Sequence, residues 1–271
     1  MAAPLALLED HVVLVTGGGS GLGLGVARRA LDHGAKLAIM EIVPEKAEAL
    51  RAEFGDEVLV HEGNCSSLAD LEACAGAIGT RFGRLDALIG MQGIFDGNMA
   101  IADIPADRLD ALFDELFRVN VKGHLLAARV FGALLRESGG AIVLTSSTAA
   151  LAADGGGAVY SATKGAIMAL VQQLAFEFAP LVRVNGVAPA GIAKSQLRGP
   201  ASLGMDGFRQ SDIPEDAFLA KFRSISLLQE LPGPEDYAIP YLFLASRQNL
   251  IVTGQTWAAD QGLLNRTLLS G

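Results

Sequence analysis

Short apolar runs alternate with longer segments of helical periodicity along most of the chain. The short runs contain several β-branched residues, and the longer segments repeat apolar residues three and four positions apart, as strands and helices respectively do. Strands are predicted over residues 11–16, 36–41, 57–61, 85–89, 141–145, 183–187 and 256–259. A first helix is predicted from the 17–23 turn to residue 33, a second begins after Pro44, and a third follows the third strand and ends near residue 81. Further helices are predicted over 106–137, 160–179, 215–227 and 234–246.

This alternation is typical of a parallel sheet with helices on both faces. Strands that are apolar throughout need cover on both sides, and crossover helices provide it. Since no linker-like or low-complexity stretch divides the chain, the pattern predicts an α/β fold with a single Rossmann-like, doubly wound domain over residues 1–271. The least regular stretch, 189–214, follows a strand end where such sheets bind ligands. We expect a substrate loop there, with subunit packing as the alternative.

Composition and charge exclude several classes of protein. The 271 residues are 51% hydrophobic, enough for a substantial core, and the net charge of -9 argues against a nucleic-acid partner. No apolar run approaches the roughly 20 residues that span a bilayer, and the start lacks a cationic lead-in. We therefore expect a cytoplasmic protein with no membrane partner. Cys65, Cys74 and the four histidines show no metal-ligand spacing, so no metal is expected.

A glycine-rich turn, TGGGSGLG at residues 16–23, joins the first predicted strand to the first helix. Such a turn lets backbone N–H groups approach a pyrophosphate, and the helix N-terminus adds partial positive charge. The spacing is G-x-x-x-G-x-G rather than the commoner G-x-G-x-x-G, and glycine-rich turns also serve simple chain reversal. Because this one follows a strand and opens a helix, it predicts dinucleotide binding.

Glu41 ends the second predicted strand, 20 residues after Gly21. A carboxylate there accepts hydrogen bonds from the adenosine ribose hydroxyls and repels a 2′-phosphate. No lysine or arginine occurs in 17–23 or at positions 42 and 43 to offset that repulsion. The sequence therefore favours NAD over NADP, and the alternative is an ordinary solvated acid at a strand end.

Tyr160 and Lys164 lie at i and i+4 on a predicted helix, so the phenol and the ammonium share a face. A nearby cation favours the phenolate and lowers the tyrosine pKa, as acid–base catalysis requires, although such a pair is usually an ordinary helix face. Ser147, 13 residues earlier, could place its hydroxyl beside the phenol. Asn120 lies in an apolar helical stretch and needs a partner such as water or a backbone carbonyl.

Together these motifs resemble the short-chain dehydrogenase/reductase family. The matching residues are the 16–23 turn, Asn120 in VNVKG, Ser147, YSATK at 160–164 and RVNGVAP at 183–189. The resemblance implies a dimeric or tetrameric Rossmann-like oxidoreductase. Tyr160 would be the acid/base and Ser147 would hold the reacting oxygen.

Further roles follow from the same resemblance. Lys164 would lower the tyrosine pKa and hold the nicotinamide ribose, and Asn120 would help to anchor a water in a proton relay. The catalytic set is then Asn120, Ser147, Tyr160 and Lys164. The implied cofactor-binding set is Gly17, Ser20, Gly21, Leu22, Gly23, Glu41, Asn64, Cys65, Gly93, Tyr160, Lys164, Pro189 and Ile192.

The second half is most similar to bacterial cis-dihydrodiol dehydrogenases of the biphenyl and phenylpropionate type, through 173–187, 196–205 and the triple glycine at 155–157. This similarity implies a homotetramer that oxidises a cis-dihydrodiol to a catechol with NAD. The chain departs from the family with Met91-Gln92-Gly93 in place of Asn-Ala-Gly, with Asn64 in place of an acid, and in the small residues at 148–153. Two alternatives remain open: an NAD-dependent dehydrogenase of another cyclic alcohol (terpenoid, steroid or cyclohexanol), and a non-catalytic NAD-binding regulator.

Overall fold

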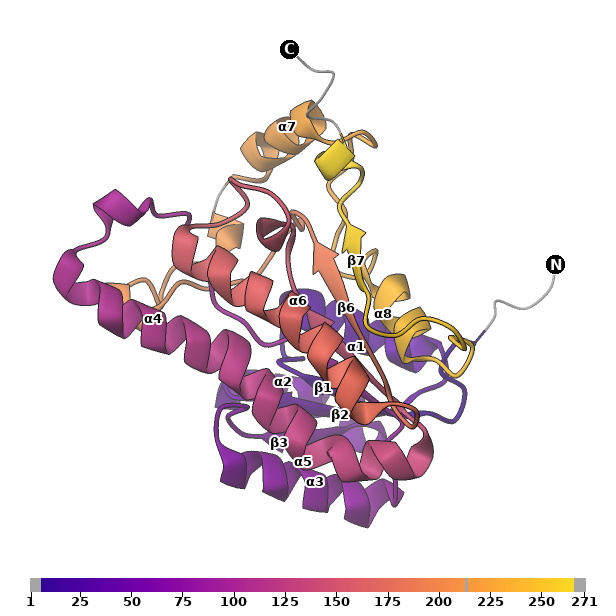
Figure 1. Cartoon of the computed structure of the whole chain (residues 1–271). Coiled ribbons are helices and arrows are strands. Elements are labelled where there is room, and N and C mark those ends of the chain that lie inside the picture. The colour runs from indigo at the N-terminus through magenta and orange to yellow at the C-terminus, as the bar shows by residue number, and fades with distance from the viewer. Residues whose placement is uncertain (1–5, 213, 266–271) are drawn as a thin grey trace.

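Seven parallel strands form one sheet at the centre of the computed structural model, which describes residues 6–212 and 214–265 (Figure 1). The strand order is β3-β2-β1-β4-β5-β6-β7, so the chain reverses direction across the sheet between β1 and β4. This is the doubly wound Rossmann-like arrangement that the sequence predicted. The strands are β1 Val12–Thr16, β2 Lys36–Glu41, β3 Leu59–Glu62, β4 Ala87–Gly90, β5 Ala141–Thr145, β6 Arg183–Pro189 and β7 Thr256–Ala259.

Helices cover both faces of this sheet. One face carries α1 (Gly21–Asp32), α2 (Pro44–Phe54) and α8 (Ala238–Ala245), and the other carries α3 (Leu68–Phe82), α5 (Gly123–Ser138) and α6 (Ala158–Phe178). Helix α4 (Leu109–Phe117) continues into α5 through a π-helical turn at Arg118–Lys122, and α7 (Glu215–Ile225) stands away from the sheet (Figure 1). No helix in the part of the chain that the structure describes is long and apolar enough to cross a membrane.

The two hydrophobic cores explain why the strands are apolar at every position. Val12 and Leu14 of β1 pack in the core beneath α3, α5 and α6. Their neighbours Val13 and Val15 pack in the core beneath α1 and α8. Successive side chains of a strand point to opposite faces, so a sheet covered on both sides needs apolar residues throughout.

Several element boundaries differ from the predicted ones. Strand β3 begins later than residue 57 because Gly55–Glu57 forms a 3₁₀ turn. Strand β4 begins at Ala87 rather than at residue 85, and the Asp86 carboxylate accepts the Val12 N–H at 2.9 Å. The helix predicted over 234–246 begins only at Ala238, and the one predicted from Tyr160 already begins at Ala158.

Candidate active site

A cleft of about 620 Å³ opens at the carboxyl edge of the sheet. It is lined by the glycine turn after β1, by the ends of β2, β4, β5 and β6, and by the first turns of α6. Part of the 189–214 loop forms another wall. The cleft therefore lies next to the point where the strand order reverses, which is where open α/β sheets bind ligands.

The glycine turn has the backbone shape that close approach requires. Gly17 and Gly21 have φ values of 71° and 51°, in the left-handed region that favours glycine. A Cβ on Gly17 would lie 2.8 Å from the backbone of Gln92, so the turn packs directly on the segment after β4. The amides of Gly21 and Leu22 belong to the first turn of α1, where a helix offers no internal acceptors.

Glu41 at the end of β2 faces this turn. Its carboxylate accepts the Gly19 N–H at 2.9 Å and the Val43 N–H at 3.0 Å, and the side chain is 5% exposed. The Gly19 amide therefore binds Glu41. Lys46 of α2, which the sequence reasoning missed, donates from Nζ to the Ser20 hydroxyl at 2.8 Å. The Lys46 ammonium thus reaches the glycine turn, although Lys46 lies outside residues 17–23, 42 and 43, the positions where the prediction considered an offsetting cation.

Tyr160, Lys164 and Ser147 line the cleft together. Tyr160 lies in the first turn of α6, and the Nζ of Lys164 is 5.5 Å from the centre of its ring. The same Nζ donates to the Thr145 carbonyl at 3.0 Å, at the end of β5. Ser147 follows β5, and its Oγ accepts the Ala149 N–H at 3.2 Å. The fold thus brings a phenol, an ammonium and a hydroxyl to one place.

Burial sets the proton affinities of these groups. It raises the pKa of Tyr160 to about 12, although the Ser147 hydroxyl acts in the opposite direction. This direction is opposite to the one predicted from the neighbouring cation. Burial also lowers the pKa of Lys164 to about 8. At neutral pH the phenol is therefore neutral while Lys164 is still an ammonium, and a single added charge nearby has a large effect on the phenol proton.

Asn120 is fully buried in the π-helical turn and does not line the cleft. Its Oδ1 accepts the Ile94 N–H at 2.9 Å, and its Nδ2 donates to the Ile94 carbonyl at 2.8 Å and to the Thr163 hydroxyl at 3.1 Å. The expected partner of this polar side chain is thus a backbone segment after β4. π-Helical turns occur frequently at functional sites, because they interrupt the regular pairing of backbone groups.

The Met91-Gln92-Gly93 segment contains a polar chain of its own. The Thr16 hydroxyl donates to Gln92 Oε1 at 2.6 Å, and Gln92 Nε2 lies 3.1 Å from Nδ1 of His124. Burial lowers the pKa of His124 to about 3, so this imidazole is neutral. Gln92, which lines the cleft, therefore connects β1 to α5, a role that its position in the sequence did not reveal.

The described part of the 189–214 loop lines the cleft and packs against the glycine turn and the segment after β4. Gln196 lies against Gly21, where an added Cβ would be 3.3 Å from its backbone nitrogen. The Arg198 carbonyl accepts the Phe95 N–H at 3.0 Å, and the Phe208 ring lies 6.1 Å from the Phe95 ring. Arg198 lines the cleft, whereas Leu203 and Phe208 pack in a small apolar cluster behind it.

The residues around the cleft fit a nicotinamide dinucleotide. The glycine turn forms one wall of the cleft, the Glu41 carboxylate beside it can accept hydrogen bonds from hydroxyl groups, and Gly93 lies beside Lys164, where an added Cβ would be 3.6 Å from Nζ. Every residue of the expected cofactor set lines this cleft: Gly17, Ser20, Gly21, Leu22, Gly23, Glu41, Asn64, Cys65, Gly93, Tyr160, Lys164, Pro189 and Ile192.

The family model for short chain dehydrogenases matches residues 11–204, which include the glycine turn, Ser147, Tyr160 and Lys164. The chain belongs to the short chain dehydrogenase family, whose members are oxidoreductases that act on CH–OH groups. Among its relatives is the 3-phenylpropionate-dihydrodiol/cinnamic acid-dihydrodiol dehydrogenase of Escherichia coli O8 (strain IAI1), with 43% identity over 96% of this chain and 95% of that protein. The protein of the same name from Shigella boydii serotype 4 (strain Sb227) has the same identity and coverage.

Proposed function

We propose that the chain oxidises a cis-dihydrodiol of an aromatic ring to the corresponding catechol, with NAD as the hydride acceptor. The observation that carries this proposal is the meeting of Tyr160, Ser147 and Lys164 beside the glycine turn in one cleft. The dihydrodiol dehydrogenase names of relatives with 43% identity over nearly the whole chain support the substrate class.

In this reaction the Ser147 hydroxyl holds one hydroxyl oxygen of the diol, and the Tyr160 phenolate takes the proton from that oxygen. When bound, NAD would supply the hydride acceptor for the carbon that carries this hydroxyl, and its oxidised nicotinamide ring would add a positive charge to the site. That charge and the Lys164 ammonium offset the burial that disfavours the phenolate. The hydroxyketone product tautomerises to a catechol, and the recovered aromaticity makes the oxidation favourable.

Lys164 and Asn120 have supporting roles in this proposal. The Lys164 ammonium holds the nicotinamide ribose while it faces the Tyr160 ring. Since the Asn120 side chain is bound to Ile94 and Thr163, its backbone carbonyl in the π-helical turn is the group that anchors a relay water.

NAD is proposed over NADP because Glu41 lies where the adenosine ribose would bind. Lys46 lies near enough to Glu41 to interact with its charge, so the preference depends on the carboxylate rather than on a lack of cations. Changing Glu41 tests this preference directly.

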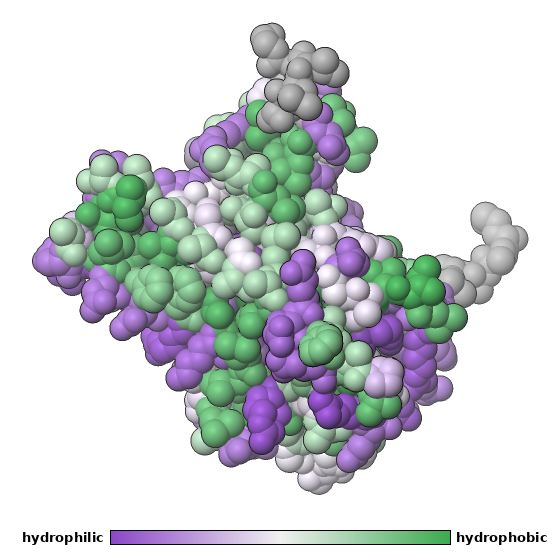
Figure 2. All heavy atoms as spheres, viewed as in Figure 1, coloured by the Kyte–Doolittle hydropathy of each residue, from purple (hydrophilic) through white to green (hydrophobic). Residues whose placement is uncertain are grey.

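The chain is further proposed to be one domain over residues 1–271 that assembles as a homotetramer in the cytoplasm. Several large apolar side chains support assembly, including Phe176 on α6 and Ile251, which are 80% and 93% exposed. Figure 2 shows hydrophobic residues gathered over α7 and over the region of α4. The outer face of α4 includes Phe113, which is 47% exposed.

A substrate panel tests the proposed function. NADH formation is measured with cis-dihydrodiols of phenylpropionate and biphenyl, with cyclohexanol, and with terpenoid and steroid alcohols, using NAD and NADP in parallel. We expect efficient turnover of the dihydrodiols with NAD only. High activity on cyclic monohydric alcohols with none on dihydrodiols would contradict the substrate class, and tight NAD binding without any turnover would identify a regulator.

A further inference from the structure

The three glycines at 155–157 bring the start of α6 into close contact with its surroundings. A Cβ on Gly156 would press on the Tyr160 ring, and one on Gly157 would lie 2.5 Å from Oδ2 of Asp96. Gly157 itself has φ −70° and ψ 175°, an extended conformation that any residue adopts. The glycine at 157 is therefore needed for the space beside Asp96 and not for backbone freedom.

Asp96 supplies the cap of the helix that carries Tyr160. Its side chain is 0% exposed, and its two oxygens accept the Gly157 N–H at 2.8 Å and the Tyr160 N–H at 2.9 Å. No capping hydrogen bond comes from the N-cap residue itself, since that residue is Gly157. A carboxylate at a helix N-terminus satisfies orphan amides and interacts favourably with the helix dipole. The segment after β4 thus holds the first turn of α6.

This segment is fixed at three neighbouring residues. Both backbone groups of Ile94 bind the Asn120 side chain, and the Phe95 N–H binds the Arg198 carbonyl of the loop at 3.0 Å. The Phe95 ring also meets the Tyr160 ring edge to face, with centres 6.2 Å apart and planes at 81°. The next residue is Asp96, so the tyrosine is attached to a segment that is itself rigidly held.

Four polar groups lie near Tyr160 or act on it electrostatically. Burial contributes most to its raised pKa, the Ser147 hydroxyl lowers it, and the negative charge of Asp96 raises it. The Lys164 ammonium lies 5.5 Å from the ring on the same helix, and the Tyr241 phenol of α8 interacts with Tyr160 electrostatically. Asp96 therefore holds the tyrosine in place while its charge disfavours the phenolate.

We propose that Asp96 is a positioning residue for Tyr160, whose carboxylate ties the first turn of α6 to the segment after β4 and so fixes the place of the phenol in the cleft. The inference rests on the proposed role of Tyr160 as the acid/base. Asp96 does not line the cleft, so it acts through the helix and not on the substrate.

Two substitutions of Asp96 test this role. Asp96→Asn keeps one acceptor oxygen and loses the charge, and Asp96→Ala loses both acceptors. We expect kcat to fall about 10-fold in the first and on the order of 100-fold in the second, with little change in the Kd for NAD. The acid limb of the kcat–pH profile should move to lower pH in Asp96→Asn, because the negative charge near the phenol is gone. Asp86→Asn, the same change just before β4, should keep the wild-type profile.

A folded Asp96→Asn protein with wild-type kcat and an unmoved acid limb would overturn the proposal. If the Asp96 variants do not fold, the Gly157→Ala variant tests the positioning role of Asp96 instead. Its Cβ displaces the carboxylate but leaves the charge, so kcat should fall about 10-fold without a shift of the acid limb to lower pH. The matched control is Gly165→Ala on the same helix, where an added Cβ meets nothing within 4 Å. Equal kinetics for the two glycine variants would contradict the proposal.

The failure of this inference can be distinguished from the failure of the proposed function. If the wild-type protein oxidises no alcohol of the panel, the proposed function is wrong. The position of α6 is then compared in crystal structures of the wild type and Asp96→Ala. The first turn of α6 and the Tyr160 ring must move in Asp96→Ala, and an unmoved first turn overturns the role of Asp96.

Discussion

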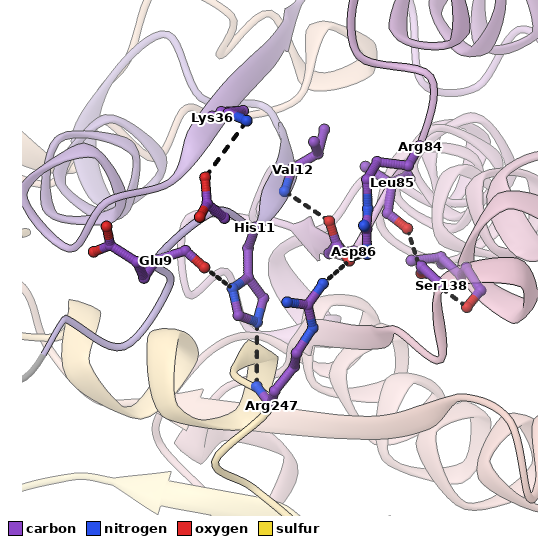
Figure 3. A network of polar contacts seen from close by, with 11 residues as sticks. Glu9, His11, Val12, Lys36, Arg84, Leu85, Asp86, Ser138 and Arg247 are labelled. Carbon is purple, nitrogen blue, oxygen red and sulfur yellow. Dashed lines mark hydrogen bonds and ion pairs between the residues drawn. The ribbon is translucent and has the colours of Figure 1, made fainter.

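The buried charged group at the amino edge of the sheet has oppositely charged partners, whereas the buried titratable groups at the carboxyl edge have none among the described residues. At the amino edge, Asp86 is 2% exposed and its oxygens accept the Val12 N–H at 2.9 Å, the Arg247 guanidinium at 2.7 Å and the Arg84 guanidinium (Figure 3). At the carboxyl edge, Tyr160 and Lys164 are buried without an oppositely charged side chain bound to either in the part of the chain described. One edge pairs its charges and the other leaves its proton-carrying groups available.

Other polar groups at the amino edge are also paired within the protein. His11 donates from Nδ1 to the Glu9 carbonyl at 2.9 Å, and its Nε2 accepts the Arg247 N–H at 3.2 Å (Figure 3). Ser138 donates to the Leu85 carbonyl at 2.6 Å. These contacts join the N-terminal segment, β4, α5 and the end of α8, and each polar group has its partner within the protein. This edge therefore contributes stability rather than chemistry.

The pKa values show the same contrast. Burial acts to raise the pKa of Asp86, but the Val12 amide and the two guanidinium groups outweigh it and hold that pKa below its usual range. At the other edge burial prevails, raising the pKa of Tyr160 and lowering that of Lys164. A charge that is already paired responds little to a new neighbour, whereas a buried group without a charged partner responds strongly. The carboxyl edge is thus the one that a bound, charged cofactor can change.

The largest expected effect comes from removing the phenol at the carboxyl edge. Tyr160→Phe should lower kcat by about three orders of magnitude while the Kd for NAD hardly changes, because the proton acceptor is lost and the cleft is kept. Steady-state NADH formation and NAD titration measure the two quantities. Tyr241→Phe removes a buried hydroxyl on α8 and should keep most of the activity. Wild-type turnover in Tyr160→Phe would exclude the proposed mechanism.

The amino edge should respond in stability and not in rate. Asp86→Asn should lower the free energy of unfolding by about 2 kcal/mol, because hydrogen bonds from charged groups lose their acceptor charge. Chemical denaturation measures this loss, and kcat below the transition should stay at the wild-type value. The loss should shrink as the pH falls through the lowered folded-state pKa of Asp86, since the wild-type carboxylate is then protonated too. A changed kcat–pH profile would show that the two edges are not independent.

Cofactor choice should depend on one carboxylate at the carboxyl edge. Glu41→Gln removes the repulsion of a 2′-phosphate, and Lys46 remains nearby, so kcat/KM with NADP should rise about 10-fold. The matched control is Glu62→Gln, because Glu62 is the register partner of Glu41 on β3. If Glu62→Gln gives the same gain, the effect is one of overall charge and Glu41 has no specific role.

The expected effect that is smallest at neutral pH, and that grows only on acidification, concerns the pH dependence of stability. The folded-state pKa of His124 is about 3, against 6.5 for an ordinary histidine, so between these values only the unfolded chain binds the proton. The free energy of unfolding should therefore fall as the pH drops below 6.5, by up to about 1.4 kcal/mol per pH unit. His124→Gln should flatten this slope in urea denaturation followed across that pH range. An unchanged slope would place the acid sensitivity elsewhere, as at Asp86.

Local sequence patterns were sufficient for the motifs whose parts lie close together in the chain. The glycine turn, the Tyr160–Lys164 pair and the seven strands depend on spacing within one or two elements. The cap of α6 could not be predicted, because Asp96 and Gly157 are 61 residues apart. Lys46 was missed for a similar reason, since 26 residues separate it from Ser20. The direction of the Tyr160 pKa was wrong because the sequence shows the neighbouring cation and not the depth of burial.

The amino-acid sequence by itself determined the alternation of strands and helices, and with it the sheet covered on both faces. The reason is that hydrophobic periodicity depends only on the spacing of residues that are close together in the chain. The sequence also determined which side chains could carry chemistry. Only the tertiary structure decided which of them meet, how Asp96, Gln92 and Lys46 join the site, and how burial sets each proton affinity. These are contacts between distant segments, and desolvation depends on everything packed around a group.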